Sequence, residues 1–195
     1  MIVPVIQARL NSTRFPGKVL ADFRGRTVLG YAVACARKAF PGTEVVLAIP
    51  AGSDRRLTQW CDVLRCNVVE GPEEDVLSRY MYVVAKLGLA DSDIIVRITP
   101  DDPLKLSLLV WLATRLVELG APYADTNHGM VTGFGAEAFT VAALRDADKL
   151  DLNPSDREHV TPGMRRRHPP GHLRASIDTA ADIVRLEELM VGAPP

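Results

Sequence analysis

The sequence predicts an α/β fold in which a mostly parallel, Rossmann-like sheet carries helices on both faces and so forms three layers. Short β-branched and apolar runs alternate with longer segments whose apolar residues recur at helical spacing. Gly, Pro or a capping residue marks most of the boundaries between them. The length of 195 residues is that of one domain with a core of its own. We therefore expect a single domain over residues 1–195.

The first part of the chain alternates strictly between strands and helices. The run IVPVIQ is β-branched and apolar, which is typical of a buried strand. Residues 27–40 have apolar positions at helical spacing and end at Pro41 and Gly42, which terminate a helix. Pro72 and three acidic residues favour a helix that begins there. The predicted strands are residues 2–7, 44–50 and 67–71, and the predicted helices are residues 27–40, 53–65 and 72–88.

The second part continues the alternation and then becomes less regular. Residues 93–99 predict a strand, residues 106–120 a helix and residues 123–127 a short strand, so the first 127 residues resemble successive βαβ units. No internal repeat or long linker divides the sequence. Beyond residue 127 the predicted strands are residues 136–140 and 173–177, and the predicted helices are residues 141–150, 155–166 and 179–190.

Composition excludes several classes of protein. Hydrophobic residues make up 47% of the chain and charged residues 24%, as in a globular protein, and no apolar run approaches the length of a membrane span. The first residues lack the features of a signal peptide, so we expect a cytoplasmic protein. Cys35, Cys61 and Cys66 show neither metal-ligand nor disulfide spacing, which favours reduced thiols.

The net charge of -1 argues against general affinity for nucleic acid, yet the first 43 residues contain seven cations and one carboxylate. Three of these cations, Arg9, Arg14 and Lys18, lie in the loop after the first strand. Pro16 and Gly17 predict a type II turn that projects Lys18 toward the other two. Such a loop favours a phosphate-bearing anion, although it matches no Walker A or G-x-G-x-x-G pattern. A solvated basic loop is the alternative.

Two carboxylates at strand ends have no evident structural task. Asp102 precedes Pro103 and is expected to cap a helix, which leaves Asp101 unexplained. Thr179 and Asp182 match a capping box, which leaves Asp178 unexplained. If both strands are parallel neighbours, Asp101 and Asp178 meet at one sheet edge near the basic loop, where Mg²⁺ would bind them together with phosphate oxygens. Turn or capping roles are the alternative for each residue.

The motifs IQARLNSTRFPGKVL, EGPEEDVLSRY, VRITPDDPL, REHVTP and LRASIDTAADI together resemble the cytidylyltransferase family. The most similar members are those of spore-coat polysaccharide biosynthesis, with the CMP-3-deoxy-manno-octulosonate and CMP-sialate synthetases as more distant relatives. The resemblance covers nearly the whole chain. It implies a nucleotidyltransferase type of three-layer fold and a CTP-dependent enzyme with Mg²⁺ as cofactor. The oligomeric state stays open between a monomer and a homodimer: relatives are often dimers, but the shortened C-terminal region argues against a complete dimer interface.

The resemblance implies roles for particular residues. The nucleotide is expected to contact Ala8, Arg9, Ser12, Arg14, Lys18 and Arg79, with Arg9 and Lys18 also acting in catalysis. Asp101 and Asp178 are expected to hold Mg²⁺. The acceptor is expected near Glu137, Arg157 and His159, the last two in an R-E-H motif with Glu158. A helix-capping cluster with one structural histidine is the alternative for that motif.

The implied reaction is attack by an acceptor oxygen on the α-phosphorus of CTP with release of pyrophosphate; sugar acids, sugars and phosphonates all offer such an oxygen. This sequence departs from the family pattern at three places. Pro100 replaces a glycine and removes a backbone N–H. Gly135 replaces an aspartate, although Glu137 is retained. The stretch before Asp178 is shorter than its counterpart.

Other functions remain as alternatives. A metal-dependent nucleotide-sugar glycosyltransferase of similar fold usually has an Asp-x-Asp motif, and Asp101-Asp102 lacks the spacer. A non-catalytic nucleotide-binding descendant would fit the three departures. Binding of RNA or DNA through Arg165, Arg166 and Arg167 is weakly supported, because no aromatic residues are interleaved, and a solvated helix end explains the run better.

Overall fold

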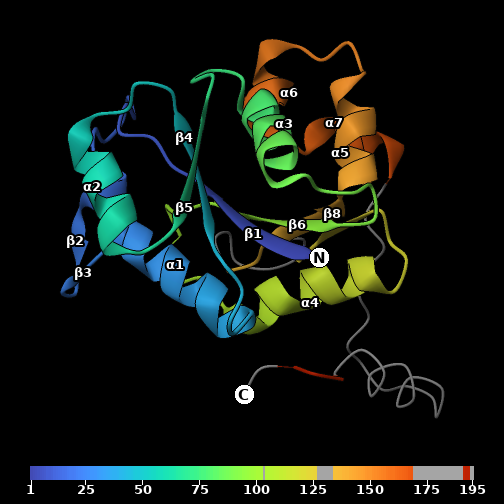
Figure 1. The fold of residues 1–195 in the computed structure, drawn as a ribbon, viewed down its shortest axis with the longest axis horizontal. Helices are drawn as coiled ribbons and strands as arrows, with labels where there is room; N and C mark the ends of the chain where they lie inside the picture. The colour runs from blue at the N-terminus through green and yellow to red at the C-terminus, as the bar shows by residue number, and fades with distance from the viewer. Residues whose placement is uncertain (103, 127–133, 169–190, 194–195) are drawn as a thin grey trace.

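The structure of the chain is a computed structural model that describes residues 1–102, 104–126, 134–168 and 191–193. Its centre is a six-stranded sheet in the order β5-β4-β1-β6-β8-β7 (Figure 1). Strands β4 and β6 flank β1 and both run parallel to it, and β5 runs parallel to β4. Strand β8 lies antiparallel between β6 and β7. The strands are β1 Ile2–Gln7, β4 Val46–Pro50, β5 Asn67–Gly71, β6 Ile94–Ile98, β7 Tyr123–Asp125 and β8 Glu137–Thr140.

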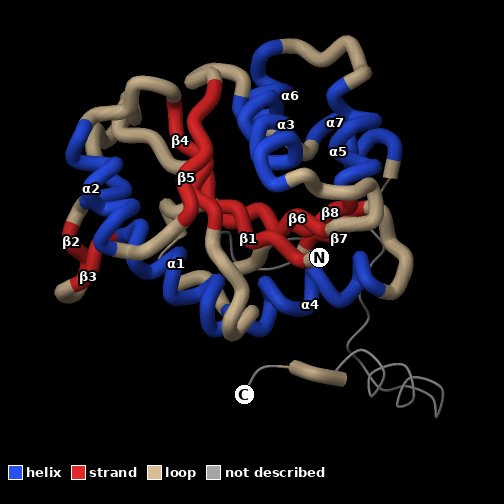
Figure 2. The backbone as a smooth tube through the Cα atoms, viewed as in Figure 1, coloured by secondary structure: helices blue, strands red, loops and turns tan. Residues whose placement is uncertain are grey.

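Helices cover both faces of the sheet, so the predicted three-layer α/β fold is confirmed (Figure 2). On one face, Leu29 of α1, Leu57 of α2 and Val110 of α4 belong to one buried apolar cluster. On the other face, Leu77 of α3 and Leu144 of α5 belong to a second cluster, to which α7 also contributes. The helices are α1 Val28–Ala39, α2 Arg55–Val63, α3 Val76–Leu87, α4 Ser107–Glu118, α5 Val141–Asp148, α6 Pro154–His159 and α7 Pro162–Arg167.

The order of the strands creates a crevice between β1 and β6. The chain moves from β1 to β4 and β5 on one side and then returns to β6 on the other side of β1. The connection from β1 leads to one side of it, whereas the chain continues from β6 toward the other side. The carboxyl ends of β1 and β6 are therefore separated by an open space, where α/β proteins bind their ligands. The fold therefore brings the loop after Gln7 to the same edge as the loop after Ile98.

One predicted helix start and one predicted helix cap are wrong. Pro72, Glu73 and Glu74 precede α3 instead of forming its first turn, because the side chain of Asp75 accepts a hydrogen bond from the Ser78 N–H and caps the helix. Asp102 does not cap α4, which begins at Ser107 after a Leu106 without side-chain capping. The carboxylate of Asp102 instead accepts hydrogen bonds from Thr99 Oγ1 at 2.9 Å and Lys105 Nζ at 3.4 Å.

The region predicted as one helix over residues 155–166 forms two helices. Helix α6 ends at His159 because Val160 has a φ of 69°, and α7 begins at Pro162. A short hairpin of β2 Asp22–Phe23 and β3 Arg26–Thr27, together with a 3₁₀ turn, η1 Lys18–Leu20, was not predicted. The strand expected at residues 173–177 and the helix expected at residues 179–190 lie outside the described residues.

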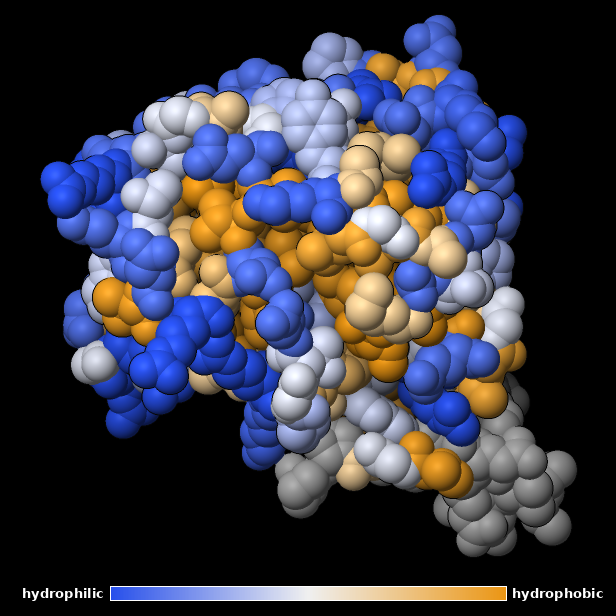
Figure 3. All heavy atoms as spheres, in the orientation of Figure 1, coloured by the Kyte–Doolittle hydropathy of each residue, from blue (hydrophilic) through white to orange (hydrophobic). Residues whose placement is uncertain are grey.

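The surface seen in the orientation of Figure 1 is mixed. Apolar residues appear at the centre of this face, and hydrophilic residues cover its left and upper edges (Figure 3). Among the described residues, no helix is long and apolar enough to span a bilayer.

Candidate active site

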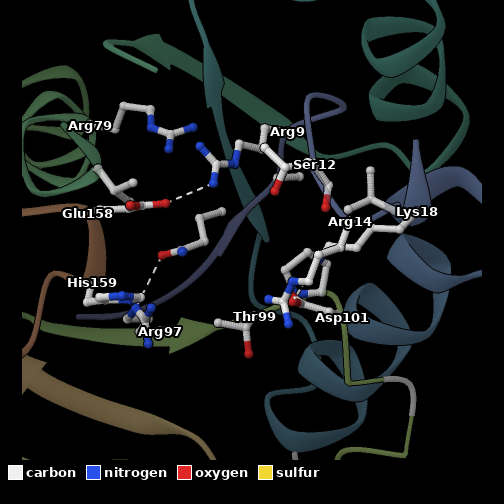
Figure 4. A pocket seen from close by; sticks show the side chains of 16 residues that line it. Arg9, Ser12, Arg14, Lys18, Arg79, Arg97, Thr99, Asp101, Glu158 and His159 are labelled. Atoms are coloured by element: carbon white, nitrogen blue, oxygen red, sulfur yellow. Dashed lines mark hydrogen bonds and ion pairs between the residues drawn. The ribbon is translucent and has the colours of Figure 1, made fainter. Parts of the chain in front are cut away.

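A cavity of about 250 Å³ opens in the crevice between β1 and β6 (Figure 4). Its walls come from the loop after β1, the loop after β6, helix α3 and the end of α6. Residues that are distant in sequence therefore line one cavity, as a common function of the predicted site residues requires. Among the residues predicted for the site, those that line this cavity are Ala8, Arg9, Ser12, Arg14, Lys18, Arg79, Asp101 and His159.

The turn that aims Lys18 has the predicted type II geometry. Gly17 has a φ of 73° and a ψ of 9°, and the Lys18 N–H donates to the Phe15 carbonyl at 3.2 Å. Gly17 accepts this positive φ because it has no Cβ. Lys18 Nζ then lies 2.6 Å from Asp101 Oδ2. The turn thus joins the loop after β1 to the loop after β6.

The cations of the basic loop find carboxylates that are remote in sequence. Arg9 Nη2 lies 2.8 Å from Glu158 Oε1 at the end of α6, and Lys18 pairs with Asp101. Arg14 lines the cavity and has no ion pair with another described residue. The three cations of this partly exposed loop therefore line one cavity, as the phosphate-binding prediction requires (Figure 4).

Arg79 brings a buried cation to the cavity from α3. Only 1% of the residue is exposed. Its Nη1 lies 3.5 Å from the Ala48 carbonyl and its Nη2 lies 3.3 Å from the Glu73 carbonyl, and burial lowers the pKa of the guanidinium. Its Nε has no hydrogen-bond partner among the described residues. Gly71 makes room for it, because a Cβ at residue 71 would lie 2.7 Å from Arg79 Cγ. A ligand with anionic or carbonyl oxygens would satisfy this cation.

Arg97 lies at the cavity wall and was missed by the sequence analysis. Its Nε donates to Gln7 Oε1 at 3.2 Å, and its Nη1 is paired with the buried carboxylate of Glu137. Burial alone would lower the pKa of Arg97, but Glu137 raises it above its usual value. An arginine inside the apolar strand run IIVRI was the available signal, because charged residues are rarely buried without a partner.

The cavity as a whole is strongly cationic. Five cationic side chains line it, against the carboxylates of Asp101 and Glu158. The cations are Arg9, Arg14, Lys18, Arg79 and Arg97. Such an excess in a partly buried space favours a ligand with several negative charges.

Glu137 and Arg157, which the resemblance places near the acceptor, are not among the described residues that line this cavity. Glu137 is 3% exposed and accepts hydrogen bonds from Tyr123, Thr161, Arg165 and Arg97. Arg157 pairs with Asp75 at 2.7 Å and with Asp148 at 2.9 Å. Both side chains thus have structural partners.

Arg165 and Arg166 lie at the solvated end of α7, as expected, with side chains that are 48% and 55% exposed. Arg165 Nη2 also lies 3.0 Å from Asp125 Oδ2 in addition to its bond with Glu137, and Arg166 Nη2 lies 2.7 Å from Asp156 Oδ2. This exposed helix end therefore also forms ion pairs with carboxylates of three other elements.

The pKa of Glu137 gives a test of this buried cluster. Burial alone would raise it, but Arg97, Tyr123 and Arg165 lower it below its ordinary value of 4.5. A carboxyl with a lowered folded pKa stabilises the protein above its unfolded pKa, and this contribution is lost as pH falls. Chemical denaturation should therefore show a gap in stability between wild type and Glu137→Gln that is largest near neutral pH and narrows below about pH 4.5.

The matched control for this experiment is Glu118→Gln, because Glu118 is 37% exposed and pairs with Arg115 on the surface of α4. Its effect should be small throughout the pH range. A gap for Glu137→Gln that stays constant from pH 7 to pH 3 would contradict the role of the ionised carboxylate.

Asp101 is the described carboxylate that suits a metal ion. Burial alone would raise its pKa, but the hydrogen bond and charge of Lys18 lower it, so the carboxylate is anionic. Its side chain is 47% exposed and faces the cation-lined cavity. Mg²⁺ commonly takes one or two carboxylates plus phosphate oxygens and water, so this donor set fits a divalent ion. Asp178 lies outside the described residues, and the described residues contain no group of three or more metal-ligating side chains.

The doubly wound sheet and the cation-rich cavity at its switch point define an α/β protein that binds a phosphate-bearing ligand. Comparison with known proteins specifies the class further. The chain belongs to the cytidylyltransferase family, whose sequence profile matches residues 3–186. This confirms the resemblance inferred from the motifs and sets aside the glycosyltransferase alternative.

Relatives at about 30% identity support the same assignment. An uncharacterised protein of Methanocaldococcus jannaschii is 31% identical over 96% of this chain and 82% of its own length. The spore coat polysaccharide biosynthesis protein SpsF of Bacillus subtilis is 30% identical over 86% of this chain and 71% of its own length. A 3-deoxy-manno-octulosonate cytidylyltransferase of Nitratidesulfovibrio vulgaris is 32% identical over 66% of this chain, and the match covers 48% of that relative.

Solved structures show the same fold. A cytidylyltransferase from Leptospira borgpetersenii has a TM-score of 0.77 at 25% identity and covers 95% of this chain and 84% of its own. A CMP:2-keto-3-deoxy-manno-octonic acid synthetase complexed with CTP has a TM-score of 0.68 at 18% identity, with 97% and 98% covered. A manganese complex of Rv0371c from Mycobacterium tuberculosis has a TM-score of 0.55 at 20% identity, with 95% and 97% covered.

Proposed function

We propose that this chain transfers CMP from CTP to an oxygen of a small-molecule acceptor, with release of pyrophosphate, in the biosynthesis of a glycan or a related metabolite. The observation that carries the proposal is the cavity at the carboxyl ends of β1 and β6, which is lined by five cations and two carboxylates. A triphosphate is a ligand with enough negative charge to satisfy these cations. Family membership supports cytidine as the base.

The cavity residues would act by charge stabilisation and positioning. The acceptor oxygen forms a bond to the α-phosphorus, the bond from that phosphorus to the bridging oxygen breaks, and the electron pair leaves on pyrophosphate. Arg9 and Lys18 neutralise the charge that grows on the leaving group, while Ser12 and Arg14 hold the phosphates from the same loop. No covalent enzyme intermediate is needed, and the acceptor hydroxyl proton passes to solvent.

The ion pairs of the ligand-free site would exchange when CTP binds. Arg9 turns from Glu158 toward phosphate oxygens, and Lys18 turns from Asp101 in the same way. The two carboxylates therefore compete with the triphosphate for the same cations. Once released, Glu158 lies beside His159 on the cavity wall formed by the R-E-H motif at the end of α6. We assign this wall to the acceptor side.

Glu158→Gln is accordingly expected to tighten CTP binding by about two- to fivefold, because an exposed ion pair contributes up to about 1 kcal/mol and its loss frees Arg9. Isothermal titration with CTP and Mg²⁺ measures this effect. Glu118→Gln is the matched control, since Glu118 and Glu158 are both 37% exposed and both pair with an arginine. Weaker CTP binding by Glu158→Gln would show that this carboxylate supports the nucleotide instead of competing with it.

We propose Mg²⁺ as the metal, held by Asp101 and Asp178. When bound, it would polarise the α-phosphate and orient the triphosphate. The half-exposed, anionic Asp101 supports this assignment, and the manganese complex of a protein with the same fold is consistent with a divalent ion. A homodimer, the single-domain organisation and the role of His159 toward the acceptor stay predictions.

Ligand-induced stabilisation tests the proposed function directly. CTP with Mg²⁺ should raise the melting temperature more than ATP, GTP or UTP, because a ligand that binds only the folded state stabilises it by mass action; at a hundredfold excess over Kd the gain is about 2.7 kcal/mol. Equal shifts for all four nucleotides would remove cytidine as the base. Pyrophosphate release should then be measured with sugar acids, sugars and phosphonates as acceptors. CTP binding without turnover on any acceptor would favour a non-catalytic descendant.

A further inference from the structure

A buried polar cluster lies next to the cavity and touches two of its walls. Its centre is the carboxylate of Glu137 at the start of β8. Oxygen Oε1 accepts hydrogen bonds from Tyr123 and Thr161, each at 2.7 Å, and from Arg165 at 2.5 Å, whereas Oε2 is paired with Arg97. Four donors of the protein therefore hold this one carboxylate.

The first wall of the cavity that Glu137 contacts is the one formed by Arg97. Arg97 and Glu137 are directly opposite each other in the antiparallel pair of β6 and β8. The arginine side chain is 12% exposed and lines the cavity beside Gln7, whose Oε1 also accepts a hydrogen bond from Tyr80 at 3.3 Å. A guanidinium held by a carboxylate on one side and an amide oxygen on another has little freedom to rotate.

The second wall is the end of α6, which carries Glu158 and His159 into the cavity. It continues into a turn that the local sequence disfavours. Val160 has a φ of 69° and a ψ of -54°, and the Thr161 N–H donates to the His159 carbonyl at 2.8 Å, which is a γ-turn in its rare, positive-φ form. For a β-branched residue this backbone conformation is an outlier.

The next residue is also in a disfavoured conformation. Thr161 has a φ of -89° and a ψ of -12°, in the helical region, although Pro162 follows it and pushes the preceding residue toward extended backbone. Two successive unfavourable residues persist only when surrounding contacts hold them. Two such contacts are visible: Val160 is completely buried in the core, and the Thr161 hydroxyl donates to Glu137.

We propose that Glu137 is a positioning residue that fixes two walls of the cavity at once. It holds Arg97 directly. Through Thr161 and the strained turn at Val160, it also fixes the positions of Glu158 and His159. The inference deepens the proposed function by assigning residues that act on the nucleotide and acceptor from behind the cavity. This positioning role does not require a direct contact between Glu137 and the acceptor, because it rests on the bonds of the carboxylate to Arg97 and Thr161.

The test compares variants of Thr161, which remove the link to the turn and leave the pairing of Glu137 with Arg97 intact. Thr161→Val keeps the shape and removes the hydroxyl, whereas Thr161→Ser keeps the hydroxyl. The readout is the imidazole resonance of His159 in the free protein, assigned with a His159→Gln variant, and its further shift on titration with CTP and Mg²⁺. Thr114→Val is the matched control, because the buried hydroxyl of Thr114 donates to the Val110 carbonyl on α4 and to no other group in the part of the chain that the structure describes.

We expect Thr161→Val to move the free His159 resonance and to reduce its response to CTP, while Thr161→Ser and Thr114→Val retain the wild-type values. If Thr161→Val and Thr114→Val lower the melting temperature by similar amounts but only Thr161→Val moves the resonance, the lost stability is not the cause of the shift. In a double-variant comparison, Glu137→Gln with Thr161→Val should displace His159 no further than Glu137→Gln alone, because both act through one hydrogen bond.

An unchanged His159 resonance in folded Thr161→Val would overturn the proposal, and so would an equal change in Thr114→Val. This decision does not depend on nucleotide binding, since the free proteins are compared. If CTP left the wild-type His159 resonance unmoved, the proposal that the nucleotide binds near the R-E-H motif would be wrong. The positioning role of Glu137 would still be decided by the spectra of the free proteins.

Discussion

Asp101→Asn is expected to lower the rate of pyrophosphate release about a thousandfold at saturating CTP and Mg²⁺, because a metal ion supplies several kcal/mol of charge stabilisation in the transition state. The amide would be a weaker ligand than the carboxylate. Asp101 is 47% exposed and its pair with Lys18 lies at the cavity mouth, so the fold should be retained. Steady-state kinetics at several Mg²⁺ concentrations measure the loss. Asp178→Asn should behave in the same way.

The matched control is Asp102→Asn, the same substitution one residue along the chain. Asp102 does not line the cavity among the described residues, and its carboxylate faces Thr99 and the buried Lys105. We expect it to lower the melting temperature while leaving turnover within a few-fold of wild type. Near-normal turnover in Asp101→Asn would remove this residue from the metal site, and an equal loss in both variants would indicate a general disturbance of the loop.

Lys18→Met is expected to lower turnover about a hundredfold to a thousandfold, the usual loss when one group that stabilises transition-state charge is removed. The structural reason is the type II turn, which places Nζ at the cavity within 2.6 Å of Asp101. The methionine keeps most of the side-chain length and removes the charge. Single-turnover measurement of pyrophosphate release separates this chemical effect from weaker CTP binding.

Lys149→Met is the control for the loss of one lysine charge, because Lys149 is 74% exposed at the end of α5 and Asp146 is its one ion-pair partner among the described residues. It should leave turnover unchanged. If Lys18→Met raised KM for CTP without lowering the single-turnover rate, Lys18 would contribute to ground-state binding only, and its catalytic assignment would be wrong.

Much of the fold could be predicted because the signals are local. The apolar run at Ile2–Gln7, the helical spacing of Val28–Ala39 and the Pro16-Gly17 turn each depend on residues close in sequence. Parallel βαβ units then bring the loops after β1 and β6 to one edge. The helix start at residue 72 and the cap at Asp102 were wrong because capping depends on side-chain geometry that several neighbouring polar residues can satisfy.

The predicted site residues that line the cavity come from the loops after β1 and β6 and, through the family motifs, from α3 and α6. Arg9, Lys18 and Asp101 follow strand ends and line the cavity. The partners of Glu137 and Arg157 could not be inferred, because they come from other elements. For Arg97 the sequence offered only a charge in an apolar strand, and its partner Glu137 lies 40 residues away.

By itself, therefore, the sequence determined the alternation of strands and helices, the turn that projects Lys18 and the family to which the chain belongs, since these depend on neighbouring residues and on ordered motifs. Only the tertiary structure decided which charges meet. Arg9 finds Glu158 across 149 positions, and β8 enters the sheet antiparallel beside β6 so that Glu137 faces Arg97. The physical reason is that a buried charge is stabilised by whichever group lies within hydrogen-bond distance, and spatial neighbours are set by strand order and packing.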